Sequence, residues 1–338
     1  HDVVLAPAPQ LYFDQLQSAN PDETAGRIPV QDLATVYAFE PVPKQLDAAQ
    51  AAHVLGAQAN VWTEHMPTMK HVEHAVFPRM DALSEVDWSP ASARDWKGFL
   101  ARLPAQFARY RAQGIGYADS AFAPQITVDR DAALRGGPVR VTLSDQVDAG
   151  VIHYTLDGSL PTSASPRYDT PFDVTLPTTV RAVTLAADST ELAAPRQRVL
   201  DRASLLTISG NAMPNCPGSD FRLRVQPMPD ATSLAPVYSI NVFNSCQLVP
   251  AAPLDRLGAI HVEAVRLERN YALAHDQKLV VSRPHRTPFG ELVVHLDSCT
   301  GPELASMPLP DPAHSARRFE LASPLPAQHG SHTLCLIY

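Results

Sequence analysis

The stretch Leu55-Gly56-Ala57-Gln58-Ala59-Asn60-Val61-Trp62-Thr63-Glu64 decides the fold of the N-terminal region. The Ala-rich run from Leu46 to Leu55 is typical of a helix that ends near Gly56. The apolar run from Ala57 to Trp62 then predicts a buried strand, and a second short strand is expected at Val3 to Ala6. Strand, helix and strand in this order are typical of a parallel α/β unit.

Two amphipathic helices are expected further along the same region. Apolar residues recur at helical spacing from Val72 to Val86, with Pro78 at a kink or a boundary. A second pattern from about Ala93 to Gly114 predicts one helix, or two shorter ones divided at an internal proline. Trp88 and Trp96 belong to these helices and are expected to pack in the core. Only two strand–helix units are visible, which is too few to close a sheet.

The rest of the sequence consists of short alternating strands. Residues 124–200 are expected to form a small antiparallel sandwich, and residues 201–338 continue as all-β structure. The dipeptide Asp157-Gly158 predicts a hairpin turn. The expected strands are Gln125–Val128, Val139–Leu143, Val151–Leu156, Val180–Leu185, Phe221–Val225, Tyr238–Phe243, Ala259–Val265, Leu292–Leu296 and His332–Tyr338.

All cysteines of the chain lie in the last region, at Cys216, Cys246, Cys299 and Cys335. None of them has CxxC or Cys/His spacing, so the sequence predicts no metal site there. An even number in a β-rich region favours two disulfides and an oxidising compartment, periplasmic or secreted. Three connectivities are possible. The pairs nearest in sequence, Cys216–Cys246 and Cys299–Cys335, are favoured, and free buried thiols are the alternative.

Composition narrows the classes of partner. The net charge is −8 and no Lys/Arg-rich run occurs, which argues against nucleic acid. No apolar stretch approaches the roughly 18 residues of a membrane span. Walker A, GxGxxG, HExxH and GxSxG motifs are absent, so no cofactor is expected. The sequence begins with His1 and shows no leader pattern, so we expect that translation starts upstream of it.

A histidine cluster also invites a metal interpretation. His71 and His74 stand three positions apart with Glu73 between them, and His65 is nearby. Two histidines at this spacing without a third spaced ligand are more typical of a solvated helix face. No metal is therefore predicted here.

Two segments combine an aromatic ring and a carboxylate at the end of an expected strand. Tyr12 and Asp14 fall on one side of a strand with Phe13 facing away, and Trp62 and Glu64 repeat the arrangement. In a parallel α/β barrel the carboxyl ends of the strands form the active-site face. A sugar site uses an indole face, a carboxylate for hydroxyls and a phenol. A core tryptophan beside a capping glutamate is the alternative.

Five segments of the first region resemble the C-terminal part of glycoside hydrolase family 20, the β-N-acetylhexosaminidases. They are His1–Pro7, Tyr12–Asp14, Val36–Pro43, Leu55–Glu64 and Phe77–Leu83. The resemblance implies the last two βα units of a (β/α)8 TIM barrel. It also implies substrate-assisted, retaining hydrolysis of terminal N-acetylglucosamine or N-acetylgalactosamine from chito-oligosaccharides or glycans.

The same resemblance assigns roles to four side chains. Tyr12 would hydrogen-bond the acetamido oxygen of the substrate, and Asp14 would contact sugar hydroxyls or the acetamido environment. Trp62 would form the hydrophobic wall of the −1 subsite. Glu64 would accept hydrogen bonds from the O4 and O6 hydroxyls.

The sequence departs from the family at the catalytic acid. Family members use an adjacent Asp-Glu pair in a His-x-Gly-Gly/Ala-Asp-Glu motif, and this motif is absent from the 338 residues. Asp22-Glu23 is the only Asp-Glu dipeptide, and its Pro/Gly-bounded loop context argues against a catalytic role. The chain alone is therefore expected to be inactive and to need a missing N-terminal barrel segment as its partner. A non-catalytic carbohydrate-binding or adhesion protein is the alternative.

Two further resemblances concern the β-rich regions. His153–Thr162 and Ser165–Tyr168 are similar to the immunoglobulin-like domain that follows the barrel in chitobiases, which implies a structural or spacer role. Gly290–Ser298 and Gly330–Leu336 resemble the second half of a family-6-type carbohydrate-binding β-sandwich, and a purely structural sandwich is the alternative. The expected architecture is thus the C-terminal part of a TIM barrel over residues 1–123, followed by two all-β sandwiches over 124–200 and 201–338.

Overall fold

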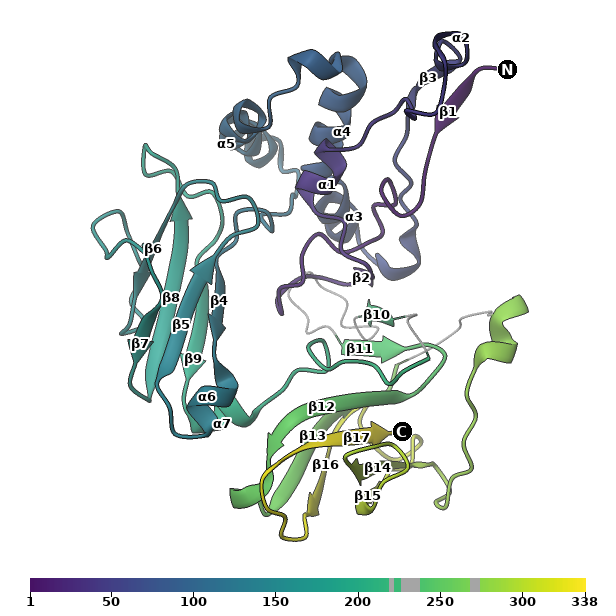
Figure 1. Ribbon diagram of the computed structural model, residues 1–338, viewed down its shortest axis with the longest axis vertical. Helices are drawn as coiled ribbons and strands as arrows, with labels where there is room; N and C mark the ends of the chain where they lie inside the picture. The colour runs from purple at the N-terminus through teal and green to yellow at the C-terminus, as the bar shows by residue number, and fades with distance from the viewer. Residues whose placement is uncertain (219–221, 226–237, 268–273) are drawn as a thin grey trace. The chain divides into compact units, whose positions relative to one another are not determined.

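The computed structural model describes residues 1–218, 222–225, 238–267 and 274–338, and the chain divides into two compact units (Figure 1). Unit 1 comprises His1–Ala133 and Pro138–Ser204, and unit 2 comprises Leu134–Gly137 and Leu205–Tyr338. Residues 123 and 124, on either side of the first expected boundary, both belong to unit 1. None of the described helices is long and apolar enough to cross a lipid bilayer.

The first part of unit 1 is mainly helical around one parallel pair of strands. Strands β1 and β3 pair in parallel, with Val3 opposite Val54 and Leu5 opposite Ala57. The elements in chain order are β1 Val3–Leu5, β2 Gly26–Arg27, α1 Leu33–Tyr37, α2 Ala48–Ala51, β3 Val54–Ala57, the 3-10 turn η1 Thr63–His65, α3 Met69–Val76, α4 Arg79–Trp88, the 3-10 turn η2 Ala91–Ala93 and α5 Trp96–Gln113.

The expectation for residues 46–62 is wrong in its boundaries. The helix is confined to α2, because Asp47 and Gln50 form a capping box that starts it and it ends after one turn. The strand lies three residues earlier than expected, at β3. In the segment that follows β3, Ala59 and Val61 pack against the hydrophobic core, whereas Trp62 is 48% exposed.

The boundary between α3 and α4 and the end of α5 lie where the sequence predicts them. Helix α3 ends and α4 begins at Phe77-Pro78, which confirms the boundary expected there. Helix α5 is continuous through Pro104, and Gly114 caps it in the left-handed conformation with φ of 71°. Pro104 removes one hydrogen bond of the helix, and the burial of Leu103 and Phe107 on either side of it offsets this loss.

The two tryptophans of these helices differ. Trp96 packs against Tyr37, with ring centroids 5.0 Å apart, as expected. The expectation that Trp88 packs in the core is wrong, because its side chain is 89% exposed. It is the last residue of α4, whose buried face is formed by Arg79, Ala82, Leu83 and Val86.

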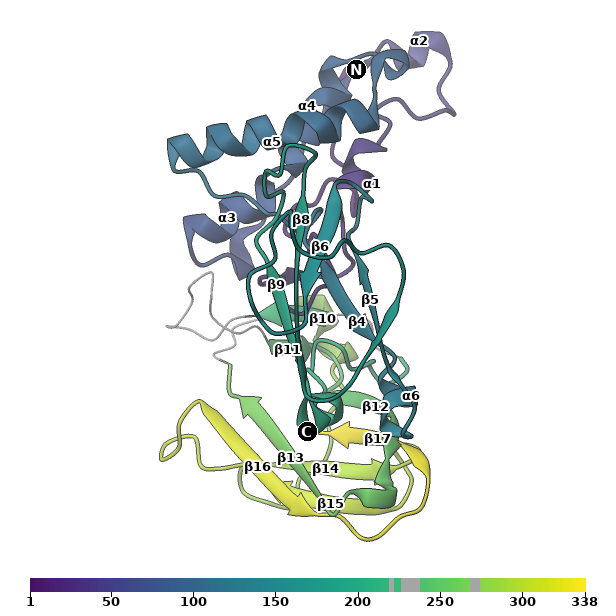
Figure 2. The same cartoon turned by 90° about the vertical axis from the view of Figure 1, so that its left-hand side faces the viewer.

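The second part of unit 1 consists of two antiparallel three-stranded sheets (Figure 2). Their strand orders are β4-β5-β7 and β6-β8-β9, and side chains of both sheets share one hydrophobic cluster that contains Val141, Val180 and Leu200. The elements are β4 Gln125–Val128, α6 Arg130–Leu134, β5 Val139–Ser144, β6 Val151–Thr155, β7 Phe172–Val174, β8 Thr178–Leu185, β9 Arg196–Leu200 and α7 Arg202–Leu206. The chain reverses after β6 as the Asp157-Gly158 signal predicts, and His153 forms an isolated antiparallel bridge with Arg167. The turn is longer than the two residues expected, because the flanking hydrogen bonds join the Tyr154 amide to the Pro166 carbonyl and the Tyr168 amide to the Ile152 carbonyl.

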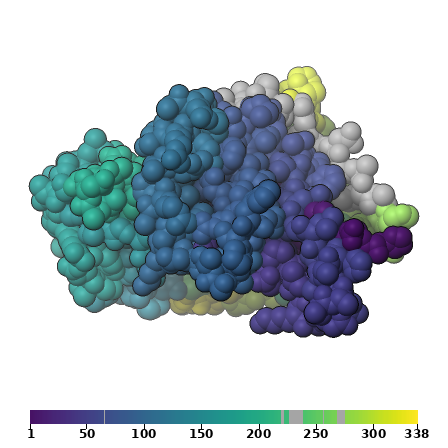
Figure 3. All heavy atoms as spheres, turned by 90° about the horizontal axis from the view of Figure 1, so that it is seen from above, coloured from purple at the N-terminus to yellow at the C-terminus, as the bar shows by residue number. Residues whose placement is uncertain are grey.

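The two parts of unit 1 share a core. Leu192 and Ala193, just before β9, are buried in the same cluster as Phe107 and Phe122. In Figure 3 the blue atoms of the helical part lie against the teal atoms of the β part. Residues 124–200 therefore do not stand apart from the helical part as a free spacer.

The described part of unit 2 is mostly β-structure, as the sequence predicts. A four-stranded sheet of order β12-β17-β14-β15 and a two-stranded ribbon of β13 and β16 share one hydrophobic cluster, and β10 pairs with β11. The elements are β10 Arg222–Val225, β11 Tyr238–Asn241, β12 Cys246–Pro253, the 3-10 turn η3 Leu254–Arg256, β13 Ala259–Val265, the 3-10 turn η4 Ala274–Leu279, β14 Glu291–Leu296, β15 Glu303–Pro308, β16 Arg318–Pro324 and β17 Ser331–Ile337. Phe221, the first residue of one expected strand, lies outside the described residues.

Candidate functional site

Tyr12 and Trp62 are brought together by a short parallel connection between their segments. The Phe13 amide donates to the Asn60 carbonyl at 2.8 Å, and the Asn60 amide donates to the Leu11 carbonyl at 2.8 Å. These bonds place the two aromatic rings side by side, with centroids 6.4 Å apart and planes inclined by 45°. The half-exposed indole of Trp62 and the partly buried phenol of Tyr12 thus form one surface.

Asp14 follows Tyr12 by two positions in the sequence, and its side chain is buried. Its side chain is 1% exposed, and Oδ2 accepts a hydrogen bond from Arg27 Nη1 at 3.1 Å. The second oxygen, Oδ1, has no hydrogen-bond partner among the described residues. The alternation expected for residues 12–14 is wrong, because Phe13 and Asp14 are both buried and the segment is a turn with one isolated bridge.

Glu64 lies on the 3-10 turn η1 that follows Trp62, and it is exposed. Within the part of the chain that the structure describes, no hydrogen bond, ion pair or ring contact joins Asp14 or Glu64 to the aromatic pair. Of the four residues expected at the site, the structure therefore brings Tyr12 and Trp62 into contact. A carboxylate flanks each of these aromatic residues two positions along the chain.

Arg79 anchors the backbone on both sides of Asp14, which sequence reasoning missed. Its guanidinium is fully buried and donates to the carbonyls of Phe13 at 2.6 Å, Gln15 at 3.0 Å and Gln31 at 3.0 Å. Burial lowers the pKa of Arg79 to about 9, so the group remains protonated at neutral pH. Because the three acceptors lie 48 to 66 positions from Arg79 in sequence, no local pattern signals this role.

Glu23 is the centre of a second buried polar network. Oε1 lies 2.6 Å from His74 Nε2, and Oε2 accepts hydrogen bonds from Ser18 Oγ at 2.7 Å and Ser120 Oγ at 2.8 Å. Burial by itself raises the pKa of Glu23, but these hydrogen bonds and the attraction of His74 outweigh it and lower the pKa to about 2. Glu23 is therefore ionised at neutral pH and has no proton to give as a general acid.

The expected solvated histidine face is not found. His71 is 1% exposed, with Nδ1 2.7 Å from Thr68 Oγ1, and His74 contacts Glu23. His71 contacts Thr68, the N-cap residue of α3, and His74 contacts Glu23 in the loop before β2. They serve the packing of unit 1.

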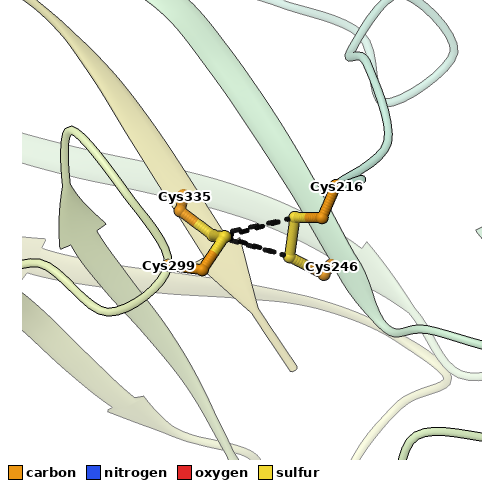
Figure 4. Close-up of side chains that lie close together, drawn as sticks. All are labelled: Cys216, Cys246, Cys299 and Cys335. Atoms are coloured by element: carbon orange, nitrogen blue, oxygen red, sulfur yellow. Dashed lines mark hydrogen bonds between the residues drawn. A yellow bond between two sulfur atoms is a disulfide. The ribbon is translucent and has the colours of Figure 1, made fainter. Parts of the chain in front are cut away.

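The cysteines of unit 2 form the disulfides Cys216–Cys246 and Cys299–Cys335 (Figure 4). This pairing joins the cysteines nearest in sequence, with separations of 30 and 36 residues. Disulfides of this kind are typical of proteins in oxidising compartments.

Comparison with known families finds two matches, and both lie mainly in unit 1. Residues 1–91 match the catalytic domain of glycosyl hydrolase family 20, and residues 134–194 match the chitobiase/beta-hexosaminidase C-terminal domain. The first match contains the Tyr12–Trp62 pair, and the second contains strands β5 to β8.

Two curated proteins with similar sequences are both named beta-hexosaminidase. A beta-hexosaminidase of Porphyromonas gingivalis is 31% identical over 177 residues, which are 51% of this chain and 22% of that protein. A beta-hexosaminidase of Akkermansia muciniphila is 37% identical over 54 residues, which are 16% of this chain and 11% of that protein. The chain therefore spans about a fifth or less of the length of these relatives.

Solved structures with detectable similarity include the GH20 beta-N-acetylhexosaminidase from Streptomyces coelicolor A3(2), at 29% identity and a TM-score of 0.30 over 34% of this chain and 23% of that chain. A GH20 exo beta-N-acetylglucosaminidase from Vibrio harveyi in complex with N-acetylglucosamine gives 29% identity and a TM-score of 0.32 over 34% and 18%. Over residues 1–91 and 134–194, then, the chain is similar to the catalytic domain of glycosyl hydrolase family 20 and to the C-terminal domain of chitobiases and beta-hexosaminidases.

Proposed function

We propose that the chain forms one side of the −1 subsite of a β-N-acetylhexosaminidase of family 20. The parent activity is hydrolysis of terminal N-acetylhexosamine from chito-oligosaccharides or glycans by the substrate-assisted, retaining mechanism. The observation that carries the proposal is the apposition of Tyr12 and Trp62 at 6.4 Å, inside the segment that matches the family's catalytic domain.

Each side chain has a distinct part in this subsite. The open indole face of Trp62 stacks on the apolar face of a pyranose ring, and the Tyr12 hydroxyl donates to the acetamido oxygen. The unpaired Oδ1 of Asp14 is an acceptor for a sugar hydroxyl, which removes the cost of leaving it buried without a partner. Exposed Glu64 accepts from the O4 and O6 hydroxyls.

The domain organisation is part of the proposal. Residues 1–123 correspond to the last two βα units of a TIM barrel, which the parallel pairing of β1 with β3 supports. Residues 124–200 form an immunoglobulin-like sandwich, supported by two sheets around one cluster. Residues 201–338 form a second sandwich, held by its disulfides.

The chain alone is proposed to be inactive. Its only Asp-Glu dipeptide contains Glu23, whose pKa of about 2 is unsuited to a general acid. Hydrolysis therefore requires a second segment that supplies the rest of the barrel, and that segment is the proposed partner. The two disulfides and the bacterial relatives support a periplasmic or secreted location.

A calorimetric titration of the full chain with N-acetylglucosamine tests the subsite. We expect saturable binding that Trp62→Ala abolishes and Trp88→Ala leaves unchanged, because Trp88 is an exposed indole on α4 outside the site. Tyr12→Phe should weaken binding of N-acetylglucosamine while leaving binding of glucose, which lacks the acetamido group, unaltered. Binding that persists in Trp62→Ala would place the sugar elsewhere and favour the carbohydrate-binding alternative.

A further inference from the structure

The two disulfides of unit 2 lie so close that their sulfurs form one cluster. Cys216 Sγ is 3.4 Å from Cys299 Sγ and 3.7 Å from Cys335 Sγ, and Cys246 Sγ is 3.5 Å from each of them. All four sulfurs lie within 4.8 Å of one another, and Figure 4 shows the side chains converging on a common centre. The cluster is therefore a single site with four potential ligand atoms.

Strand pairing places two of these sulfurs independently of the disulfide bonds. Cys246 opens β12 and lies opposite Ile337 of β17, while Cys335 of β17 lies opposite Leu248. The two cysteines are thus offset by two positions along adjacent strands, which puts their side chains on the same face of the sheet.

Hydrogen-bonded loops place the other two sulfurs. The Cys216 amide donates to the Cys246 carbonyl at 3.4 Å, next to an isolated bridge between Asn215 and Gln247. Cys299 lies in the tight turn after β14, in which the Gly301 amide donates to the Ser298 carbonyl at 3.0 Å. None of these backbone hydrogen bonds involves a sulfur atom.

The spacing of the sulfurs across the two pairs suits a tetrahedral thiolate site. A zinc ion with Zn–S bonds of about 2.3 Å requires S···S edges of roughly 3.8 Å. The four cross-pair distances are 3.4 to 3.7 Å, within a few tenths of an ångström of that edge. Three of the cysteines are buried, and Leu248 and Ile337 pack against the cluster and limit its contact with water.

We propose that the same four cysteines bind one zinc ion when both disulfides are reduced. A phosphine transfers two electrons to each disulfide, takes up the oxygen of one water molecule as its oxide, and leaves two thiols that carry the protons of that water. Zinc then displaces four thiol protons and is held by four thiolates. Unit 2 is thereby stapled by two disulfides under oxidising conditions and by a metal under reducing conditions.

Cobalt(II) is a direct probe of this site, because a tetrahedral cobalt tetrathiolate absorbs visible light through ligand-field and charge-transfer bands. The full chain is reduced with a phosphine, freed of reductant under nitrogen and titrated with cobalt and then with zinc. We expect one cobalt per chain with the tetrahedral spectrum, complete loss of that spectrum on adding one zinc, and no such spectrum from the oxidised chain.

Two variants separate a metal site from adventitious thiol binding. Cys299→Ser removes one ligand and should lose the tetrathiolate spectrum, whereas Ser298→Ala in the same turn should keep it. If reduction alone unfolds unit 2, one equivalent of zinc should restore its circular dichroism and melting transition, since the metal binds only the folded arrangement.

Three results would overturn the proposal. They are a reduced, folded chain that shows no tetrahedral cobalt spectrum, an equal spectrum in Cys299→Ser, and a reduced, unfolded chain that zinc does not refold. A failure here leaves the sugar subsite untouched, because the part of N-acetylglucosamine binding that depends on Trp62 reports on unit 1.

Discussion

The Arg79 guanidinium donates a hydrogen bond of 2.6 Å to the carbonyl oxygen of Phe13, a residue 66 positions away in the sequence. Phe13 lies between Tyr12 and Asp14, so the bond fixes the backbone from which both proposed sugar contacts project. The guanidinium carbon also lies 4.6 Å from the centroid of the Phe13 ring. Arg79 is therefore a positioning residue beneath the proposed subsite.

Replacing Arg79 with methionine should lower the free energy of unfolding by about 3 kcal/mol or more. Each buried carbonyl that loses its donor costs roughly 1–3 kcal/mol, and Arg79 serves at least three of them. Urea unfolding of the full chain measures the loss. Arg109→Met, an exposed arginine on α5, is the matched control and should change stability by less than about 0.5 kcal/mol. Equal effects of the two substitutions would contradict the anchoring role.

The ionised Glu23 should make stability depend on pH. Its pKa is about 2 in the folded chain and 4.5 in a solvated reference, so its contribution is complete above about pH 5 and is lost as the pH falls toward 2. The pH-dependent part amounts to about 3 kcal/mol. The difference in unfolding free energy between the wild-type chain and Glu23→Gln should therefore shrink by this amount over that range. A difference that is constant with pH would show that the carboxylate charge does not stabilise the fold.

Arg196 couples the β part of unit 1 to its helical part. It lies at the start of β9, forms an ion pair with Asp22, and contacts Asp119 through two hydrogen bonds of 2.8 and 3.1 Å. A double-mutant cycle of Arg196→Gln with Asp119→Asn should give a coupling of about 1–2 kcal/mol. The exposed Arg167–Asp169 pair is the control, and its coupling should be smaller, below about 1 kcal/mol. If the two couplings are alike, the Arg196 contacts do not hold the parts together.

An aryl N-acetylglucosaminide tests the proposed lack of activity. The intact chain should release no aryl alcohol above the buffer rate, because the proposal assigns the general acid to the second segment that completes the barrel. The assay follows absorbance of the released phenol over hours, with a family-20 hexosaminidase as positive control. Turnover by the chain that Glu64→Ala abolishes would contradict the proposal.

Local sequence patterns predict several strands and helix ends of the structure correctly. The period-two strands Gln125–Val128 and Ala259–Val265 are found with the expected bounds, and Gly114 caps α5 as expected. Burial is a different matter, because it depends on which segments meet. Nothing near Trp88 indicates that it lies on the open side of its helix, and nothing near Arg79 indicates that distant carbonyls surround it.

The candidate site likewise combines residues that the sequence indicates with contacts that it does not indicate. The sequence shows an aromatic residue followed two positions later by a carboxylate at Tyr12 and again at Trp62. The bridge between Tyr12 and Asn60 that brings the two aromatic residues together is a tertiary contact, which the sequence does not indicate. The approach of the two disulfides likewise follows from the register of β12 against β17. The order of the cysteines along the chain favours the observed pairing among three possible ones, but it does not indicate that the two disulfides form one cluster.

The chain contains three tryptophans, Trp62, Trp88 and Trp96, so the indole N–H signals in a proton–nitrogen NMR spectrum test the sugar subsite most directly. During titration with N-acetylglucosamine, we predict a saturable shift of the Trp62 signal, assigned through Trp62→Phe, while the Trp88 signal stays in place. A Trp62 signal that does not move while other signals shift saturably would contradict the assignment of this surface as the sugar site.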